Sequence, residues 1–249
     1  MQLYFKATKK IFKPIIQKIA RGGKGREDLL ESAFFAYAHR NPVIDKIFWG
    51  RLKAVEQYIR KRELCEILDF GCGSGVLSYN LGQAGLNVVA TDTDPVPFRE
   101  VKKFIQFPAI VKFVPSLELD AKKYPGRFDA IVALDVLEHI EDTDNAIDFL
   151  VSLLKPDGEI IVSGPTENFL YKIGRCLAGK EFTGTYHKTD IKKIRKLFEK
   201  RAEVRTIKKI YPFLPLFDSF SALLVGFSLQ AILYHFKFGN SLLKISAQT

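Results

Sequence analysis

The chain has 249 residues, of which 47% are hydrophobic and 27% are charged, and its formal net charge at pH 7 is +10. This length and composition suit one α/β domain with a full core and exclude wholesale disorder. Cys65, Cys72 and Cys176 are too few and too scattered for a disulfide framework, and no C-x-x-C pair indicates a zinc site. A reducing, cytoplasmic location is therefore expected.

The positive charge is concentrated at the N-terminus. Residues 1–26 contain eight Lys and Arg and no acid, so the remaining residues carry a net charge of only +2. Apolar side chains in 3–20 recur at helical spacing opposite a basic face, which predicts a basic amphipathic helix, with a Gly-rich linker at 21–25. We assign 1–26 to this helix and linker, and 27–249 to the main domain. The helix could dock on an anionic membrane surface, pack on its own domain or bind nucleic acid.

Two more helices are expected before the first strand, at 28–37 and 43–61. The second carries Trp49 and Arg51, which could lie over a ligand pocket. An aromatic side chain on a helix is, however, more often part of the core.

Residues 66–78 read E-I-L-D-F-G-C-G-S-G-V-L-S, a strand pattern, an acid, three alternate glycines and the start of a helix. Such a turn lets a ligand approach the backbone, and the helix N-terminus offers free N–H groups. A dinucleotide fingerprint starting at Gly71 would need Gly or Ala at position 76, where this chain has Val76. This disfavours an NAD(P)-dependent oxidoreductase.

The turn resembles the first motif of class I S-adenosylmethionine (SAM) methyltransferases, carried here by Asp69, Gly71, Gly73 and Gly75. The resemblance implies that the acid and the glycine backbone hold the methionine end of SAM. The ammonium and carboxylate of SAM would complement a carboxylate and free N–H groups. It also implies that Asp92, at the end of the next strand, accepts hydrogen bonds from the ribose hydroxyls.

The resemblance adds Cys72, Thr93 and Leu134 to the residues that line the cofactor. The family usually has an acid after its third strand that meets the adenine amine. The aligned position here is near Leu117, with Glu118 and Asp120 as displaced substitutes, so the adenine contact stays open.

Two further matches, F-D-A-I-V-A-L-D-V-L-E-H at 128–139 and L-L-K-P-D-G-E-I-I-V at 153–162, extend the resemblance over about 43–168. Strand signals at 66–70, 87–91, 109–114, 128–134, 158–163 and 203–210 alternate with helix signals at 75–84, 96–104, 143–154 and 189–200. This alternation predicts a doubly wound, mostly parallel α/β sheet, and the resemblance implies the seven-stranded, Rossmann-like methyltransferase type. Its ligand sites should lie at the carboxyl ends of the strands.

Between 211 and 236 the only charged residue is Asp218. We expect an apolar insert at about 211–238 with a helix at 220–236, and a last antiparallel strand at 241–247. The helix could be buried, lie at an interface as a lid, or span a membrane.

Asp135, Glu138 and His139 form D-x-x-E-H, and His187 follows 48 residues after His139. This resembles the E-x-x-E-H plus distal His of metal-assisted O-methyltransferases, which act on small RNA and, in part, in ubiquinone biosynthesis. One interpretation is a divalent ion on all four residues that acidifies an acceptor hydroxyl. The other is a metal-free site in which Asp135 and His139 or His187 do the acid–base work.

The loop after 128–134 reads Leu134-Asp135-Val136-Leu137 rather than the N/D/S-P-P-Y/F of enzymes that methylate exocyclic amines of bases. The expected activity is transfer of a methyl group from SAM to a hydroxyl of a small or lipid-like acceptor, with a carbon or carboxylate as second choice. An RNA 2′-O-methyltransferase and a non-catalytic SAM-fold scaffold are the alternatives. Peripheral docking on the cytoplasmic face of a membrane is expected as well, and nucleic acid is the less favoured partner.

Overall fold

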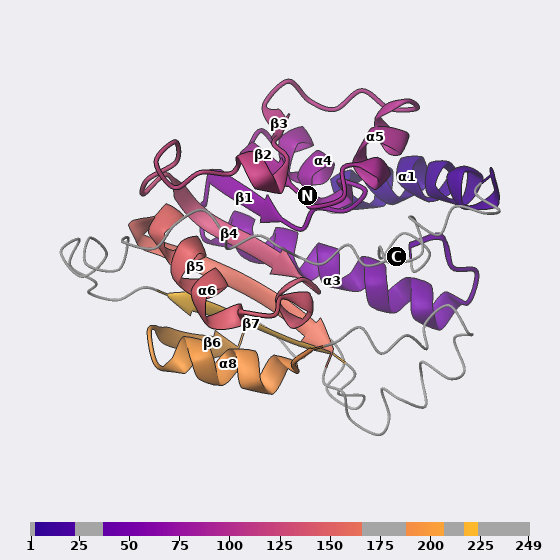
Figure 1. Cartoon of the computed structure of the whole chain (residues 1–249). Coiled ribbons are helices and arrows are strands. Elements are labelled where there is room, and N and C mark those ends of the chain that lie inside the picture. The colour runs from indigo at the N-terminus through magenta and orange to yellow at the C-terminus, as the bar shows by residue number, and fades with distance from the viewer. Residues whose placement is uncertain (1–2, 23–36, 166–187, 207–216, 224–249) are drawn as a thin grey trace.

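The computed structural model describes residues 3–22, 37–165, 188–206 and 217–223 (Figure 1). Its helices are α1 (Leu3–Gly22), α3 (Pro42–Lys61), α4 (Val76–Gln83), α5 (Val96–Lys102), α6 (Thr143–Leu153) and α8 (Ile191–Glu199), with short 3-10 turns η2 (Ser116–Glu118) and η3 (Leu137–His139). Its strands are β1 (Glu66–Phe70), β2 (Asn87–Thr91), β3 (Val111–Phe113), β4 (Phe128–Leu134), β5 (Leu154–Pro165), β6 (Glu203–Thr206) and β7 (Phe217–Leu223).

The strands form one sheet in the order β3-β2-β1-β4-β5-β7-β6. The strands from β3 to β5 are parallel, whereas β7 runs antiparallel to both β5 and β6. β1 lies between β2 and β4, and its Asp69 is in register with Ala90 of β2 and Val132 of β4. β2 and β3 lie on one side of β1, and β4 and β5 lie on the other, so the carboxyl ends of β1 and β4 flank the switch point at which open α/β sheets bind ligands.

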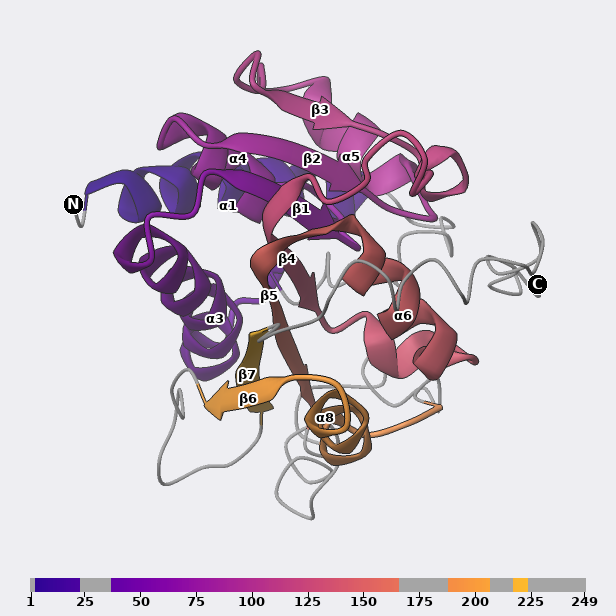
Figure 2. The ribbon, with the colours of Figure 1, turned by 90° about the vertical axis from the view of Figure 1, so that its left-hand side faces the viewer.

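Helices cover both faces of this sheet. Side chains from α1, α3 and α4 join one buried cluster on one face, and side chains from α6 and α8 join a second cluster on the other. Figure 2 shows α3 and α6 on opposite sides of the strands. The predicted doubly wound, Rossmann-like architecture is therefore confirmed, and the elements expected between 43 and 206 are present with small shifts at their ends.

The apolar side of α1 packs on the domain. Phe12 and Ile16 are buried in the first cluster, and the Phe12 ring meets Tyr79 of α4 edge-on at a centroid distance of 5.0 Å. Thr8, which interrupts the apolar stripe in the sequence, is buried too, and its hydroxyl donates to Asn80 Oδ1 at 2.7 Å. Of the roles left open for this helix, the structure favours packing on its own domain.

Polar contacts hold α3 in place along the sheet. The Asp45 carboxylate near its N-terminus forms ion pairs with Lys9 and Lys13 of α1. Near its C-terminus, the Tyr58 hydroxyl donates to the buried Glu159 carboxylate of β5 at 2.7 Å. The helix is thus tied to the sheet and to α1, which fixes the side chains between these two points.

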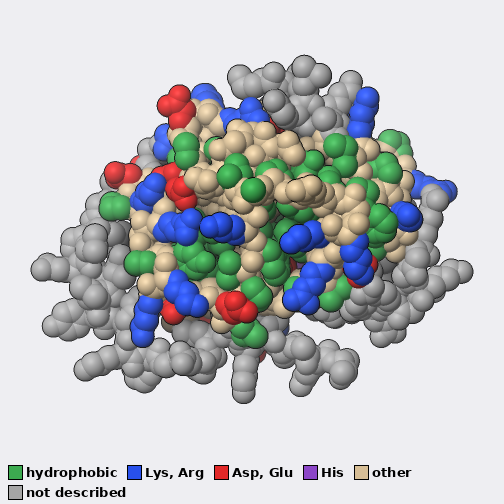
Figure 3. All heavy atoms as spheres, turned by 90° about the horizontal axis from the view of Figure 1, so that it is seen from above, with side chains coloured by type: hydrophobic (Ala, Val, Ile, Leu, Met, Phe, Trp, Pro, Cys, Tyr) green, Lys and Arg blue, Asp and Glu red, His purple; other side chains and the backbone are tan. Residues whose placement is uncertain are grey.

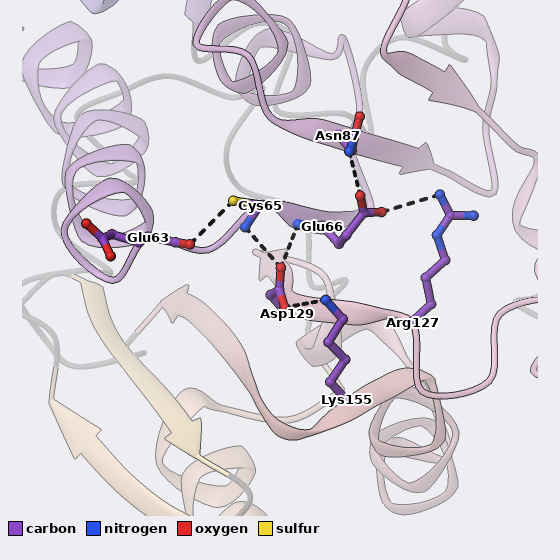
Figure 4. Close-up of polar contacts among 7 residues, drawn as sticks. All are labelled: Glu63, Cys65, Glu66, Asn87, Arg127, Asp129 and Lys155. Atoms are coloured by element: carbon purple, nitrogen blue, oxygen red, sulfur yellow. Dashed lines mark hydrogen bonds and ion pairs between the residues drawn. The ribbon is translucent and has the colours of Figure 1, made fainter.

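Polar contacts also close the end of the sheet at which the parallel strands begin, here called the amino edge (Figure 4). The Asp129 carboxylate accepts from the backbone N–H groups of Cys65 and Glu66 at 3.0 and 2.8 Å, and from Lys155 Nζ at 2.6 Å. Although partial burial opposes ionisation, these donors lower the pKa of Asp129 below its ordinary value. The hydrogen bonds and the ion pair of Asp129 therefore stabilise the fold at this end of the sheet.

The structure corrects the start of the apolar helix expected at 220–236, over residues 220–223. Residues 217–223 form β7 instead, paired from Leu223 opposite Glu159 to Phe217 opposite Pro165 of β5. Hydrogen bonding along β5 and β6 decides this conformation, since an apolar run alone does not distinguish a buried strand from a buried helix. The rest of that insert, the strand expected at 241–247 and residues 28–36 lie outside the described residues.

β5 also begins at Leu154 rather than at 158. Leu154 pairs with Phe128, and the register then shifts so that Ala130 lies opposite Glu159. The turn 155–158 is thus an irregularity within the strand.

Within the described ranges, the structure contains no helix with the length and apolar content needed to cross a bilayer.

Candidate cofactor and acceptor site

The three glycines between β1 and α4 have positive φ angles, and each meets different surroundings. A Cβ on Gly71 would lie 2.1 Å from Val136 Cγ2, and one on Gly75 would lie 2.7 Å from the Phe98 ring. A Cβ on Gly73, with φ of +52°, would meet nothing within 4 Å. Gly71 and Gly75 are therefore needed for packing, and only Gly73 presents its backbone to open space.

The turn is fastened to the end of β2. The N–H groups of Gly71 and Cys72 both donate to the Thr91 carbonyl, at 2.8 and 3.0 Å, and the Gly73 N–H donates to Asp92 Oδ2 at 2.7 Å. Asp92 Oδ1 accepts from the Asp94 N–H at 3.0 Å. Because a carboxylate has about four acceptor positions, Asp92 can still accept hydrogen bonds from a ligand.

Asp69 is buried at the end of β1, where the Ser78 hydroxyl of α4 donates to its Oδ2. Burial raises the pKa of Asp69 to about 6, partly opposed by the Ser78 hydrogen bond and reinforced by the charge of Asp92. Burial also raises the pKa of Asp92. Two neighbouring carboxylates in a poorly solvated place favour a ligand that brings positive charge or hydroxyl donors.

Cys72 and Leu134 are half-buried and pack against the same hydrophobic cluster. Burial raises the pKa of the Cys72 thiol well above its ordinary value, and Asp69 and Asp92 raise it further. Cys72 therefore stays a neutral thiol, suited to contact and unsuited to nucleophilic attack. The side chain of Thr93, the other residue of this group, is exposed.

Polar atoms without partners among the described residues gather at the end of the sheet where the parallel strands finish, here called the carboxyl edge. Thr91 Oγ1, Ser116 Oγ, Asp135 Oδ1 and Ser163 Oγ are buried and have no hydrogen-bond partner within the part of the chain that the structure describes. They lie at or just beyond the ends of β2, β3, β4 and β5. Because unmet buried polar groups are costly, this edge is built to be completed by a ligand, in contrast to the amino edge.

The residues considered for the adenine contact lie in different surroundings. Leu117 is 80% exposed, Glu118 is exposed as well, and the Asp120 carboxylate accepts from the Lys122 N–H. Ser116 is buried beside them, and its N–H donates to the Asp92 carbonyl at 3.0 Å. This backbone hydrogen bond places Ser116 beside Asp92, and the small hydroxyl of Ser116 gives no distinctive signal in the sequence.

Asp135, directly after β4, is paired with Arg51 of α3. Arg51 is only 1% exposed, and its guanidinium lies 4.6 Å from the centroid of the Phe48 ring. Although burial opposes its charge, Asp135 raises the pKa of Arg51, so the guanidinium stays ionised. Burial raises the pKa of Tyr37 to about 12, while a hydrogen bond from Arg51 opposes that rise.

The sequence analysis did not foresee this ion pair. Its signal is the phase of Arg51 on α3, because position 51 falls on the same face as the buried Leu52, Val55 and Ile59. A charged side chain on a buried face requires a partner of opposite charge. The sequence alone does not say which of the distant acids supplies it.

The residues of the D-x-x-E-H motif do not form a metal cluster with other described residues. Asp135 faces Arg51, Glu138 is buried, and His139 is half-buried at the end of η3. The Glu138 carbonyl accepts from the Lys188 N–H at 2.9 Å, which ties this turn to the segment before α8. His187 lies outside the described residues, so its part in the motif stays a prediction.

Comparison with known proteins gives matches for most of the chain. A family model described as a methyltransferase domain matches residues 27–205. A ubiquinone biosynthesis O-methyltransferase from Azotobacter vinelandii is 31% identical over 121 residues, 47% of this chain and 51% of that protein. A mitochondrial protein of the same name from Schizosaccharomyces pombe is 26% identical over 130 residues, 49% of this chain and 47% of that protein. The chain spans about half the length of these curated relatives.

Solved structures share the fold. Magnesium protoporphyrin IX methyltransferase from Synechocystis PCC 6803, with bound S-adenosylhomocysteine (SAH), superposes with a TM-score of 0.52 at 21% identity over 75% of this chain and 89% of that chain. The methyltransferase domain of bacterial CtHen1 does so with a TM-score of 0.54 at 20% identity, over 70% and 98% of the two chains. The family match over residues 27–205, on a sheet of this topology, identifies the chain as a member of the class I SAM-dependent methyltransferase family.

Proposed function

We propose that the protein transfers a methyl group from SAM to a hydroxyl of a small or lipid-like acceptor. The observation that carries this proposal is the open face of Gly73, whose N–H donates to the half-buried Asp92 carboxylate, at the end of the sheet where the Asp69 carboxylate is buried. Nothing in the described turn fills that space, and the acids favour a ligand with an ammonium and hydroxyl groups. Asp69 and the turn would hold the amino-acid end, and Asp92 the ribose.

Bound SAM supplies a methyl group on a sulfonium, which is already a good electrophile. The protein then has to align the acceptor oxygen with the S–CH₃ bond, exclude water and remove a proton. Asp135 and His139 follow β4, next to β1 in the sheet, so they lie at the same edge as the cradle. We propose that His139 removes the proton of the acceptor hydroxyl, with His187 as a further candidate. Asp135 would orient that hydroxyl.

The names of the relatives support a hydroxyl acceptor, because two of them are ubiquinone biosynthesis O-methyltransferases. The loop Leu134-Asp135-Val136-Leu137 lacks the sequence of base amine methyltransferases. An RNA 2′-O-methyltransferase is the second candidate, supported by the D-x-x-E-H motif. The two differ in the acceptor and share the cofactor cradle.

A second, narrower proposal is peripheral docking through a basic and apolar patch beside α1. The patch consists of Ile11, Lys18, Lys102, Lys103 and Phe104, with Ile11 42% and Phe104 46% exposed. Lys18 Nζ lies 4.8 Å from the Phe104 ring centroid, next to a pocket of about 550 Å³ formed by residues 102–109 and 111. Viewed from the side of β3 and α5, Lys and Arg side chains lie among hydrophobic ones (Figure 3). This chemistry fits an anionic lipid surface.

Replacing Asp69 by Asn should change stability with a sign set by its raised pKa. The pKa is about 6 when folded against 3.8 for an ordinary Asp, so its contribution is fully present below about pH 4 and is lost as the pH rises past 6. Unfolding free energies measured by denaturant titration should therefore show wild type losing roughly 2–3 kcal/mol relative to Asp69→Asn between pH 4 and pH 7. SAH affinity, measured by calorimetry, should fall roughly ten- to a hundredfold.

Asp129→Asn is the matched control at the opposite edge. Its donors lower the pKa of Asp129, so wild type should gain stability relative to this variant as the pH rises, and SAH affinity should not change. Equal SAH binding by wild type and Asp69→Asn would mean that the Asp69 carboxylate does not take part in cofactor binding. No SAH binding by wild type, with Asp92→Ala as the negative reference, would overturn the SAM assignment.

His139→Ala should lower methyl transfer roughly a hundredfold or more while leaving SAH affinity unchanged, because the base acts on the acceptor. The assay is mass spectrometry of products after incubation with labelled SAM, host lipid extract, phenolic acceptors and host RNA. Label on an acceptor oxygen supports the proposal. Label found only in RNA would replace it with the second candidate, and full activity of His139→Ala would exclude His139 as the base.

Charge reversal at Lys18 and Lys102, both to Glu, should weaken flotation with anionic vesicles at low salt, because each Lys near such a surface contributes about 1 kcal/mol. Reversal of Lys192 and Lys193, exposed on α8 at the far end of the sheet (Figure 1), is the control with the same change in charge. Equal loss in both variants would mean that net charge alone acts. No flotation of wild type would remove the docking proposal.

A further inference from the structure

Asp135 is the first residue of the D-x-x-E-H motif, and its charge is already balanced from inside the protein. Its Oδ2 contacts Arg51 Nη1, and the Arg51 side chain is 1% exposed, whereas the Asp135 side chain is 18% exposed. The acid thus faces the carboxyl edge of the sheet and the arginine lies behind it. A divalent ion placed on Asp135 would have to share this carboxylate with a fixed positive charge.

Arg51 is held too firmly to move aside. Its helix is tied at one end by Asp45 to α1 and at the other by Tyr58 and Arg62 to Glu159 of β5. Its guanidinium also packs on the Phe48 ring. A buried guanidinium without its carboxylate would be strongly destabilising, so the pair forms a permanent part of the site.

We propose that Arg51 is the resident cation of the acceptor site and takes the place of the divalent ion that the D-x-x-E-H resemblance implies. Arg51 acts through Asp135 as a positioning residue, holding the carboxylate in one orientation. Asp135 Oδ1, buried and without a partner among the described residues, is left to accept a hydrogen bond from the acceptor hydroxyl. A guanidinium cannot acidify a bound hydroxyl as a metal does, so proton removal falls to a side-chain base. This inference rests on the proposed function.

Manganese binding tests the inference without an acceptor. Mn²⁺ is titrated into wild type, Asp135→Asn, Arg51→Met, Arg51→Lys and the double variant Arg51→Met with Asp135→Asn, and free Mn²⁺ is followed by electron paramagnetic resonance. Wild type and Arg51→Lys should show no site that depends on Asp135. Arg51→Met should bind Mn²⁺ at least about tenfold more tightly than wild type, and the double variant should lose this gain. Mn²⁺ should also raise the melting temperature of Arg51→Met only.

Arg62→Met is the matched control, because Arg62, directly after the end of α3, pairs with Glu159 of β5 away from the carboxyl edge, and this variant should gain no Mn²⁺ site. An Mn²⁺ site in wild type that Asp135→Asn removes would overturn the inference. So would an Arg51→Met variant that folds and binds SAH yet gains no Mn²⁺. Should Arg51→Met not fold, wild type, Arg51→Lys and Asp135→Asn still decide. Loss of the proposed function would show separately, as a failure of wild type to bind SAH.

Discussion

Three carboxylates have to be kept at one edge of a sheet where little water reaches them. Asp69 is held by the Ser78 hydroxyl, Asp92 by backbone N–H groups, and Asp135 by the arginine of α3. Only the last of these partners carries a full positive charge. The first two acids therefore keep raised pKa values in the ligand-free protein and leave the edge incomplete.

The two edges of the sheet show what this incompleteness means. At the amino edge, Asp129 has three donors and a lowered pKa, so it contributes to stability near neutral pH. At the carboxyl edge, Asp69 costs stability under the same conditions, and buried hydroxyls such as Thr91 Oγ1 and Ser163 Oγ lack partners in the described part. A site that a ligand completes lowers the stability of the ligand-free protein, as is common at functional sites.

The helices on the first face transmit order to this edge. α1 covers α4, whose first turn carries Ser78, and α3 carries Arg51 to Asp135. Packing of α1 on α4 therefore helps to fix the position of Asp69, and the anchoring of α3 helps to fix the position of Asp135. The basic side of α1 is partly used in ion pairs with Asp45, which ties this helix to α3.

Local patterns in the sequence predict the parallel sheet and the positions of Asp69 and Asp92, because Asp69 lies at the end of an apolar strand before a glycine turn and Asp92 directly follows the next apolar strand. They do not separate the roles of the glycines: Gly71 and Gly75 are fixed by contacts with Val136 and Phe98, which are distant in sequence. The Arg51–Asp135 ion pair could not be predicted for the same reason, because its two residues are distant in the sequence. The expected helix at 220–236 is wrong over 220–223, since pairing with β5 and β6 overrides local preference.

A crystal structure of the protein grown with saturating SAH tests the central claim most directly, namely that the open face of Gly73, beside Asp92 and at the end of the sheet where Asp69 is buried, is the cofactor site. The ribose hydroxyls should lie within about 3 Å of the Asp92 carboxylate. The amino-acid end should lie against Gly73 and Asp69, with the Arg51–Asp135 pair intact beside the sulfur. SAH bound elsewhere, or a cradle left empty at saturation, would contradict the account.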